Sequence, residues 1–412
     1  MGSLDPCSTT ISALKAPYVS NYSGDYIAID ESQADSLGVR TTTVPSGTNF
    51  WIRVVACPSA NASTCGNLTY PHDGETVLYA SLTQLCMNSS VVTTLGAQAA
   101  CQTGASPPPQ GRLTLSSNTP VMTSDMVNAG SVYYTPYVGN QIPIYDACCS
   151  AFSNYTFSQL TMTLNSSNQT STNIYDLYVF VDTTNSGSVT IGAGPAWYSS
   201  ASRCMTSCST DVTQLTDMTY SSGFWVNANT ITLTNDATTY YVPASAATYV
   251  GSVYMTASGA TSVQFEPAAA AGGSGTVVGL WNAYNRVRVT SSSSDSTSTW
   301  TYSGAWRDAN NSASNSIKWL DGLGQTSISA AYDALGNNSS ASGSTNIGVG
   351  INAIATPAIY SQVTNTTALF TMHGATMSPP ILGLNITNAI ERATAGTETF
   401  YGGNLLTLKT EY

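Results

Sequence analysis

The sequence predicts a mainly β protein: an antiparallel β-sandwich or jelly-roll body with a smaller β-rich N-terminal domain. Only 8% of the 412 residues are charged, against about 25% in ordinary soluble domains, while 42% are hydrophobic. Ser, Thr, Asn and Gly take the place of the missing charge, and Thr suits the pleated, half-buried surface of a strand. Short apolar runs recur between Gly, Ser and Asn turns, whereas the helix formers Lys and Glu are scarce.

The length of the chain fits two or three domains of about 100–200 residues each. Residues 1–104 form the predicted N-terminal domain, which is β-rich. In the run 49–55, Phe50, Ile52 and Val54 share one face by the two-residue period of a strand. Residues 76–79 give a second strand.

Residues 105–130 are predicted to be a Pro-rich linker or a long surface loop within one domain. Pro107, Pro108 and Pro109 follow one another, and such a run favours a stiff, extended segment that cannot join a strand ladder. Both alternatives remain open from the sequence.

Residues 131–352 form the predicted sandwich or jelly-roll body. The run 160–164 alternates apolar and polar residues, as a strand with one buried face does. The run 174–181 is apolar at almost every position, which indicates a strand covered on both faces. Further strands are predicted at residues 188–191, 230–233, 240–242, 249–255, 262–265, 277–281, 286–289, 299–302 and 327–331.

Two stretches of low complexity, 267–275 and 291–298, are predicted to be loops because Ala, Gly and Ser dominate them. Residues 353–412 form the predicted C-terminal segment. It contains a weak helix at residues 385–394 and a terminal strand at residues 405–408.

The charge balance argues against two classes of partner. Lys and Arg number 11 against 22 acids, giving a formal net charge of −11, and the basic residues do not cluster. Nucleic-acid binding requires such a basic footprint, and so does binding to an anionic membrane surface, so we expect neither partner. No apolar run reaches the roughly 18–20 residues of a membrane-spanning helix, and the first 20 residues predict no secretory signal peptide.

The nine cysteines are an odd number, so at least one is unpaired or pairs between chains. We predict disulfide bonds in preference to free thiols, and both in preference to a zinc site, because the repeated close Cys or His pairs of zinc sites are missing. The candidate disulfide residues form three short-loop pairs: Cys57 with Cys65, Cys86 with Cys101, and Cys204 with Cys208.

The usual sequence motifs of catalysis are absent, and we predict neither an enzyme nor a cofactor or metal site. No nucleophile elbow, phosphate loop or dinucleotide fingerprint occurs, and His72–Glu75 is better explained as a turn. Asp176 stands inside the apolar run 174–181. We interpret it as a buried, hydrogen-bonded structural acid rather than a functional one.

Aromatic residues are concentrated in the second half of the chain. Exposed rings beside Asn, Asp or Gln can bind a sugar, whereas packing in a core or between subunits is the more common use of such rings. The core and interface interpretation is favoured. The candidate glycan-binding or interface residues are Trp197, Tyr198, Trp225, Trp281, Trp306 and Trp319.

Four segments resemble motifs of tailed-bacteriophage virion surface proteins of the tail-fibre or head-fibre type. They read SVYYTPYVGNQIPIYD from Ser131, IYDLYV from Ile174, GPAW from Gly194 and GLWNAYNRV from Gly279, in the same order as in that family. The likeness spans residues 130–350. After Asp146 this chain has Ala-Cys-Cys where the family pattern has a glycine, which places the following turn in question.

The resemblance implies a structural subunit of a bacteriophage virion: a fibre, a spike or a capsid-decorating protein. Such a subunit is made in the host cytoplasm and is exposed on the particle. Its expected partners are further copies of itself, with a trimer favoured, other virion proteins and a host-surface glycan. Residues 1–104 would then dock to the particle. The alternatives are a carbohydrate-binding adhesin and, with less support, a polysaccharide depolymerase.

Overall fold

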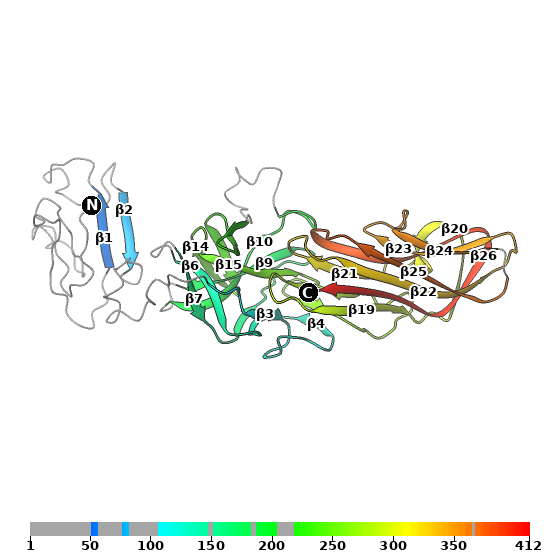
Figure 1. Ribbon diagram of the computed structural model, residues 1–412, viewed down its shortest axis with the longest axis horizontal. Helices are drawn as coiled ribbons and strands as arrows, with labels where there is room; N and C mark the ends of the chain where they lie inside the picture. Colours follow the sequence, from blue (N-terminus) through cyan, green and yellow to red (C-terminus); the bar gives the residue numbers. More distant parts are fainter. Residues whose placement is uncertain are drawn as a thin grey trace, which may run out of the picture. The chain divides into compact units, whose positions relative to one another are not determined.

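The computed structural model describes residues 51–56, 76–81, 106–146, 151–182, 187–203, 218–364 and 367–412, with the first two ranges described by backbone alone. The chain divides into two compact units. Unit 1 comprises Met1–Ala105, Tyr145–Ser153 and Thr183–Gly187, and unit 2 comprises Ser106–Ile144, Asn154–Asp182 and Ser188–Tyr412. The prediction of a mainly β, sandwich-type fold is confirmed, because the regular secondary structure of the described residues is almost entirely β-strand (Figure 1).

Two strands of unit 1 form an antiparallel pair. Strand β1 (Trp51–Ala56) pairs with β2 (Thr76–Ser81) from Trp51↔Ser81 to Ala56↔Thr76. Both predicted N-terminal strands are therefore confirmed. All nine cysteines, and with them the three candidate disulfides, lie outside the described residues, as does the predicted turn at His72.

An eight-stranded antiparallel sheet lies in unit 2, in the order β11-β12-β15-β9-β10-β13-β14, with β18 pairing β15. Its strands are β9 (Ile174–Asp182), β10 (Ser188–Ala196), β11 (Met218–Ser221), β12 (Phe224–Asn227), β13 (Ile231–Asn235), β14 (Thr238–Val242), β15 (Ala247–Tyr254) and β18 (Leu280–Asn282).

The central strand β9 is buried on both faces, as its apolar run predicts. Tyr175, Leu177 and Val179 belong to one hydrophobic cluster. Ile174, Tyr178 and Phe180 belong to the other, which contains Trp281 and Leu320. Because successive side chains of a strand point to opposite faces, a strand between two cores is apolar at almost every position.

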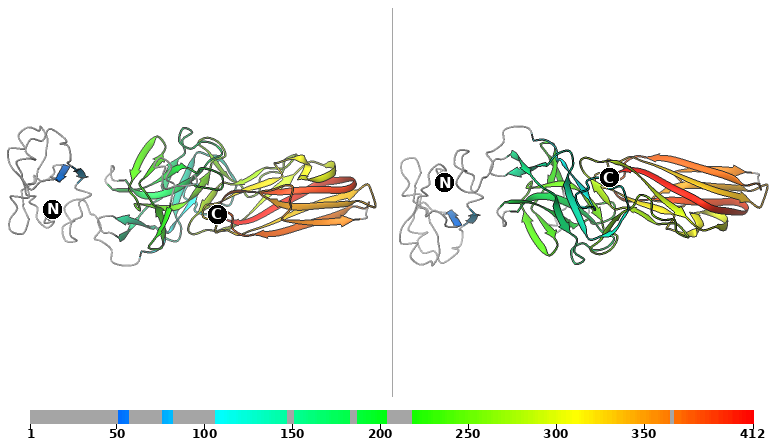
Figure 2. Two further views of the ribbon diagram at one scale, coloured as in Figure 1. Left: turned by 90° about the horizontal axis from the view of Figure 1, so that it is seen from above. Right: turned by 90° about the horizontal axis from the view of Figure 1, so that it is seen from below.

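An eleven-stranded sheet forms the C-terminal part of unit 2. It comprises β4 (Met126–Ala129), β16 (Thr261–Val263), β17 (Thr276–Val278), β19 (Arg288–Asp295), β20 (Thr299–Asp308), β21 (Ser316–Asp321), β22 (Ile328–Asn338), β23 (Ser344–Ile351), β24 (Ile359–Thr364), β25 (Phe370–Ser378) and β26 (Gly383–Glu411). Strands β17 and β21 are parallel, and the other pairs of this sheet are antiparallel. Both views of Figure 2 show its long strands side by side along a common direction.

Strand β26 has two arms, separated by the exposed segment 394–397. The first arm pairs with β21 and β23, and the second arm pairs with β19 and β22. Gly396 has a φ of 76°, which a residue with a side chain adopts at a cost, and it lies at the change of direction. Strand β20 follows both arms, pairing through Trp300↔Phe400 and Arg307↔Glu391.

Two smaller sheets complete the described part of the chain. Strand β5 (Ser131–Pro136) lies between β3 (Gly111–Thr114) and β8 (Leu160–Thr163), and β6 (Gln141–Asp146) forms a sheet with β7 (Ala151–Thr156). The one helical element among the described residues is the short 3₁₀ turn η4 (Ala309–Asn311).

Three predictions need correction. Residues 106–130 belong to unit 2 rather than to a linker, because β3 is buried and pairs with β5, and β4 pairs with β16. The predicted helix at 385–394 is the first arm of β26: pairing on both sides overrides the helix preference of its Ala, Glu and Arg residues.

The serine run from Ser291 is strand β19 rather than a loop. It pairs with β26 from Ser291↔Leu408 to Asp295↔Asn404. A run of serines does not by itself favour a strand. The small side chain does fit where another backbone segment lies close to the strand. The Ser291 hydroxyl, for example, donates a hydrogen bond to the Gln264 carbonyl at 2.9 Å. The terminal strand predicted at residues 405–408 is confirmed as part of β26.

Candidate functional site

Asp176 of β9 is fully buried and hydrogen-bonded, as predicted. Its carboxylate accepts two bonds from Arg203, at 2.7 Å from Nε and 3.1 Å from Nη2. The Ser252 hydroxyl of β15 donates to the same carboxylate at 2.6 Å, and it is itself 2.7 Å from the Tyr249 hydroxyl. A bidentate guanidinium and a hydroxyl together compensate the cost of burying this charge.

Arg203 is enclosed by aromatic rings and backbone. Its guanidinium carbon lies 4.1 Å from the centre of the Trp197 ring, and its Nη2 also donates to the Gly322 carbonyl. Burial disfavours the charged guanidinium, but Asp176 and the nearby tyrosines outweigh burial and raise the pKa of Arg203. The group therefore ties β9 to the segment that follows β21 and stays charged.

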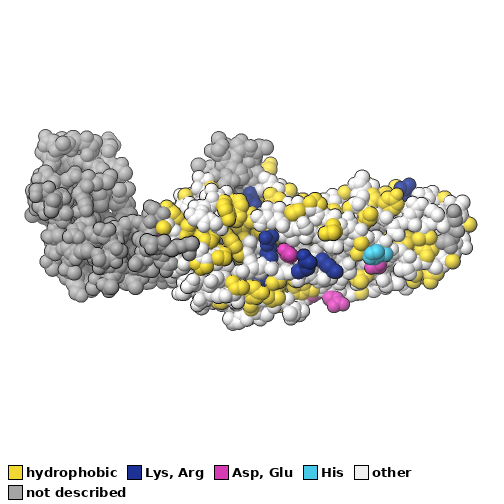
Figure 3. Space-filling model, in the orientation of Figure 1, with side chains coloured by type: hydrophobic (Ala, Val, Ile, Leu, Met, Phe, Trp, Pro, Cys, Tyr) yellow, Lys and Arg dark blue, Asp and Glu magenta, His cyan; other side chains and the backbone are white. Residues whose placement is uncertain are grey.

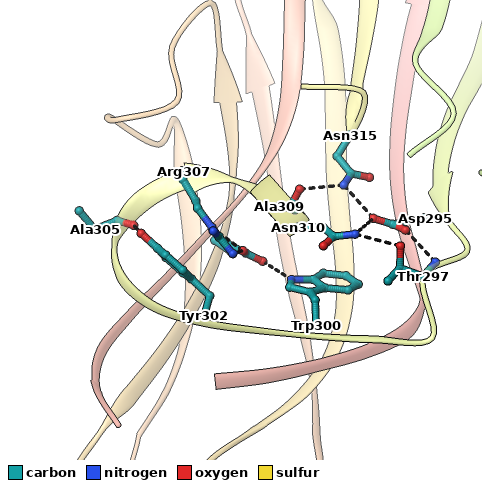
Figure 4. Close-up of polar contacts among 10 residues, drawn as sticks. Asp295, Thr297, Trp300, Tyr302, Ala305, Arg307, Ala309, Asn310 and Asn315 are labelled. Atoms are coloured by element: carbon teal, nitrogen blue, oxygen red, sulfur yellow. Dashed lines mark hydrogen bonds and ion pairs between the residues drawn. The ribbon is translucent and has the colours of Figure 1, made fainter. Parts of the chain in front are cut away.

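A second buried acid, Glu391, lies on the first arm of β26. Its Oε1 accepts from Arg307 Nε at 2.8 Å and Nη2 at 2.7 Å, and its Oε2 accepts from Trp300 Nε1 at 2.8 Å. The Arg307 guanidinium stacks over the Tyr302 ring at 3.6 Å. Figure 4 shows Trp300, Tyr302 and Arg307 of β20 gathered around this contact. Burial raises the pKa of Glu391 although these donors oppose it.

Glu398 begins the second arm of β26 and lacks such a cation. The side chain is buried, the Thr345 hydroxyl donates to Oε2, and Oε1 has no hydrogen-bond partner among the described residues. Burial, with the negative charge of Glu391 as a second cause, raises the pKa of Glu398 to about 8. Glu398 is consequently protonated at neutral pH.

Asp295, at the end of β19, organises three loop segments. Its Oδ1 accepts hydrogen bonds from the backbone N–H groups of Gly272 and Thr297, at 2.9 and 2.8 Å. Its Oδ2 accepts from the side-chain amides of Asn310 and Asn315, both at 2.9 Å, and Figure 4 shows the contacts with Thr297, Asn310 and Asn315. Burial works against the carboxylate, but these hydrogen bonds prevail and lower the pKa of Asp295.

The buried acids of the described residues each have hydrogen-bond partners inside the fold. A glycoside hydrolase places two carboxyl groups on either side of a bound sugar. Glu391 and Glu398 are buried from solvent, and Glu391 is engaged by Arg307 and Trp300. Within the described residues, no group of three or more His, Cys, Asp or Glu side chains is placed to hold a metal ion.

The six candidate aromatic residues do not form one site. Trp197, Trp281 and Trp319 are core residues with exposed fractions of 4%, 0% and 0%, so burial leaves them no face for a sugar or a neighbouring subunit. Trp225 and Trp306 are half-buried and contact Tyr220 and Tyr360 edge to face. Tyr198 alone of the six is exposed.

The sequence interpretation singled out Asp176 but missed its partner Arg203, and it also missed Arg307, the partner of Glu391. Cations are rare in this chain, and each of these two is close in sequence to a tryptophan or tyrosine, which was the available signal. It also missed that Asp333 and His373 face each other across β22 and β25, with 2.6 Å between Oδ1 and Nδ1 on the exposed surface.

The comparisons with known proteins assign no relatives. No protein-family model matches the chain, and no curated protein matches it. Among the described residues, no helix is both long and apolar enough to cross a membrane.

Proposed function

We propose that this chain is a structural subunit of a bacteriophage virion, a fibre, spike or capsid-decorating protein that is exposed on the particle. The observation that supports this proposal most is that its buried acidic side chains connect separate strands and loops. Asp176, Asp295 and Glu391 are each engaged by three or more hydrogen bonds that connect separate strands or loops. Such networks fix a rigid scaffold, which is what an assembly subunit requires.

The segments that carry the family resemblance support the same proposal. The three segments that begin at Ile174, Gly194 and Gly279 lie in or beside β9, β10 and β18 of the eight-stranded sheet. Their apolar residues fill the two cores, so their sequence reflects packing. The proposed partners are other copies of the chain and other virion proteins, and the proposed location is the virion.

A carbohydrate-binding adhesin is the second candidate, favoured by one observation. Trp306 of β20 is half-buried and meets the 53% exposed Tyr360 of β24 edge to face, with ring centres 5.8 Å apart. Aromatic rings with one open face bind sugar rings. Binding on a glycan array that Trp306→Ala abolishes would favour this candidate over the first. The polysaccharide depolymerase has less support, since Glu391 and Glu398 are both buried.

The direct test of the virion proposal is co-purification with particles. An antiserum raised against the purified chain should label virions recovered from a lysate of cells that produce it, and peptides of the chain should appear in the digested particles. Recovery of the chain only in the particle-free fraction of that lysate would contradict the proposal.

A further inference from the structure

One layer of the C-terminal sandwich presents an ordered outer face made by β25, β22, β26 and β19. The strand registers define three cross-strand rows on it. The first is Met377–Ser329–Lys409–Thr290, the second Ala375–Ala331–Thr407–Ser292 and the third His373–Asp333–Leu405–Ser294. The alternate residues of the same strands, among them Tyr332, Leu406 and Leu408, point into the core.

The middle row of this outer face consists only of small side chains: Ala375, Ala331, Thr407 and Ser292. Larger residues stand in the rows on either side. Met377 is 78% exposed in the first row, and Leu405 is half-buried in the third. The rows on either side therefore project farther from the sheet than the middle row does, and a second sheet would contact them first.

Charged side chains lie on both sides of the middle row. Just beyond the first row, Arg288 and Glu411 form an ion pair with each other at 3.6 Å across β19 and β26. Lys409 lies in the first row, is exposed, and forms no ion pair with any described residue. Asp333 lies in the third row on β22, the strand next to the β26 strand of Lys409. Its side chain is 43% exposed and lies beside His373. Figure 3 looks onto this face, where the cyan histidine has an acid beside it and dark-blue cations lie farther along.

We propose that the outer face binds the same face of a second copy of this chain, about a two-fold axis along the middle row. Such an axis exchanges the first and third rows while keeping β22 over β22 and β26 over β26. Lys409 of one copy then lies over Leu405 of the other and one strand from the second copy's Asp333, and the contact occurs twice. The opposite charges of Lys409 and Asp333 are the reason why a second copy of this chain fits the outer face.

This inference rests on the proposed function and adds to it the surface through which two copies of the chain associate. A two-fold contact joins copies in pairs, so it predicts a dimer, or two trimers joined face to face, in place of the isolated trimer expected from the sequence. The two Lys409–Asp333 contacts set both the register and the direction of the pair.

The test is a charge exchange, read by sedimentation of the full chain across a concentration series. Lys409→Asp and Asp333→Lys each place like charges together twice. Each should raise the dissociation constant of the pair at least about tenfold. The double variant restores opposite charges and should recover most of the affinity. Ala331→Arg, in the middle row, should abolish pairing.

Two control variants separate this contact from a general effect of charge. Lys409→Arg keeps the charge and should pair like the unaltered chain. Arg392→Asp makes the same reversal on the first arm of β26, outside the outer face, and should also pair normally. Thermal unfolding of every variant verifies that it is folded.

Three outcomes overturn the inference. One is a double variant that pairs as weakly as the single variants. Another is an oligomer that none of the variants changes, in which case assembly uses a different surface and the proposed function stands. The third is a chain that stays monomeric at every concentration, which removes self-assembly as well and leaves the labelling of particles to decide the proposed function.

Discussion

Glu391 and Glu398 lie on opposite arms of β26, and both carboxyl groups are buried, but only Glu391 is paired with a cation. Arg307 and Trp300 compensate the charge of Glu391. Glu398 has the Thr345 hydroxyl and an unpartnered Oε1 within the described structure. The same strand therefore carries one acid suited to the charged form and one suited to the protonated form.

The Glu398→Gln variant should be more stable than the unaltered chain at alkaline pH. Because the pKa of Glu398 is raised to about 8 from 4.5, its contribution is fully present below pH 4.5 and is lost as pH rises through 8. At pH 9, glutamine should raise the free energy of unfolding by about 3–5 kcal/mol. Denaturant titrations at pH 5 and pH 9 measure the free energy of unfolding of the two proteins. Equal stability at pH 9 would contradict the raised pKa of Glu398.

The matched control is Glu391→Gln. It leaves the partly buried Arg307 without its carboxylate, so it should destabilise the fold at both pH values. It also removes the negative charge that helps to raise the pKa of Glu398, and the pH dependence that remains should be smaller.

Asp295→Asn should lower the free energy of unfolding at neutral pH and change it little in acid. The folded-state pKa of Asp295 is lowered, so its contribution is present above the ordinary value and is lost as pH falls through the lowered one. The unaltered chain should lose this contribution below about pH 4, whereas the variant should be about 1–3 kcal/mol less stable at neutral pH and lack that slope. Identical unfolding curves from pH 7 to pH 3 would refute the role of Asp295.

Asp176→Ala should prevent folding or lower the free energy of unfolding by about 3–5 kcal/mol, because Arg203 would remain buried without its carboxylate. Replacing both partners, as Asp176→Leu with Arg203→Met, should recover much of the loss. Urea titration of the unaltered chain, the Asp176→Ala variant and the double variant measures these free energies of unfolding. A well-folded Asp176→Ala protein that has lost a glycan-cleaving activity would contradict the structural role.

Gly251→Ala should lower the free energy of unfolding by about 3 kcal/mol or more, because a Cβ there would collide with the Trp281 carbonyl oxygen and the Leu113 side chain. Gly251 lies at the register shift between β9 and β15. Gly223→Ala is the control: its φ is also positive, at 97°, but it faces open space, so only about 1–2 kcal/mol of backbone strain is expected. Equal losses in thermal unfolding would mean that the bulge tolerates a side chain.

The sequence predicts the fold class and many of the strands, because strands with a buried face carry their pattern locally. Strand β9 is the clearest example: its unbroken apolar run reports the two cores that enclose it. The first arm of β26 and the serine strand β19 were missed for the opposite reason. Their local preferences favour a helix and a loop, and only pairing with distant strands decides their structure.

The buried charge networks were predictable only in part. Asp176 stands out because it interrupts an apolar run, whereas nothing near Arg203 in the sequence connects it to a residue 27 positions earlier. Glu391 and Arg307 are 84 positions apart and meet only because β20 follows β26. Such pairs depend on strand order, which periodicity does not encode.

The central claim, that this chain is an assembly subunit, is tested most directly by its native mass and shape, from light scattering combined with negative-stain imaging of the full chain. We predict a stable oligomer of defined stoichiometry. A monodisperse monomer at every concentration would contradict the claim and would direct attention to glycan binding at Trp306 and Tyr360.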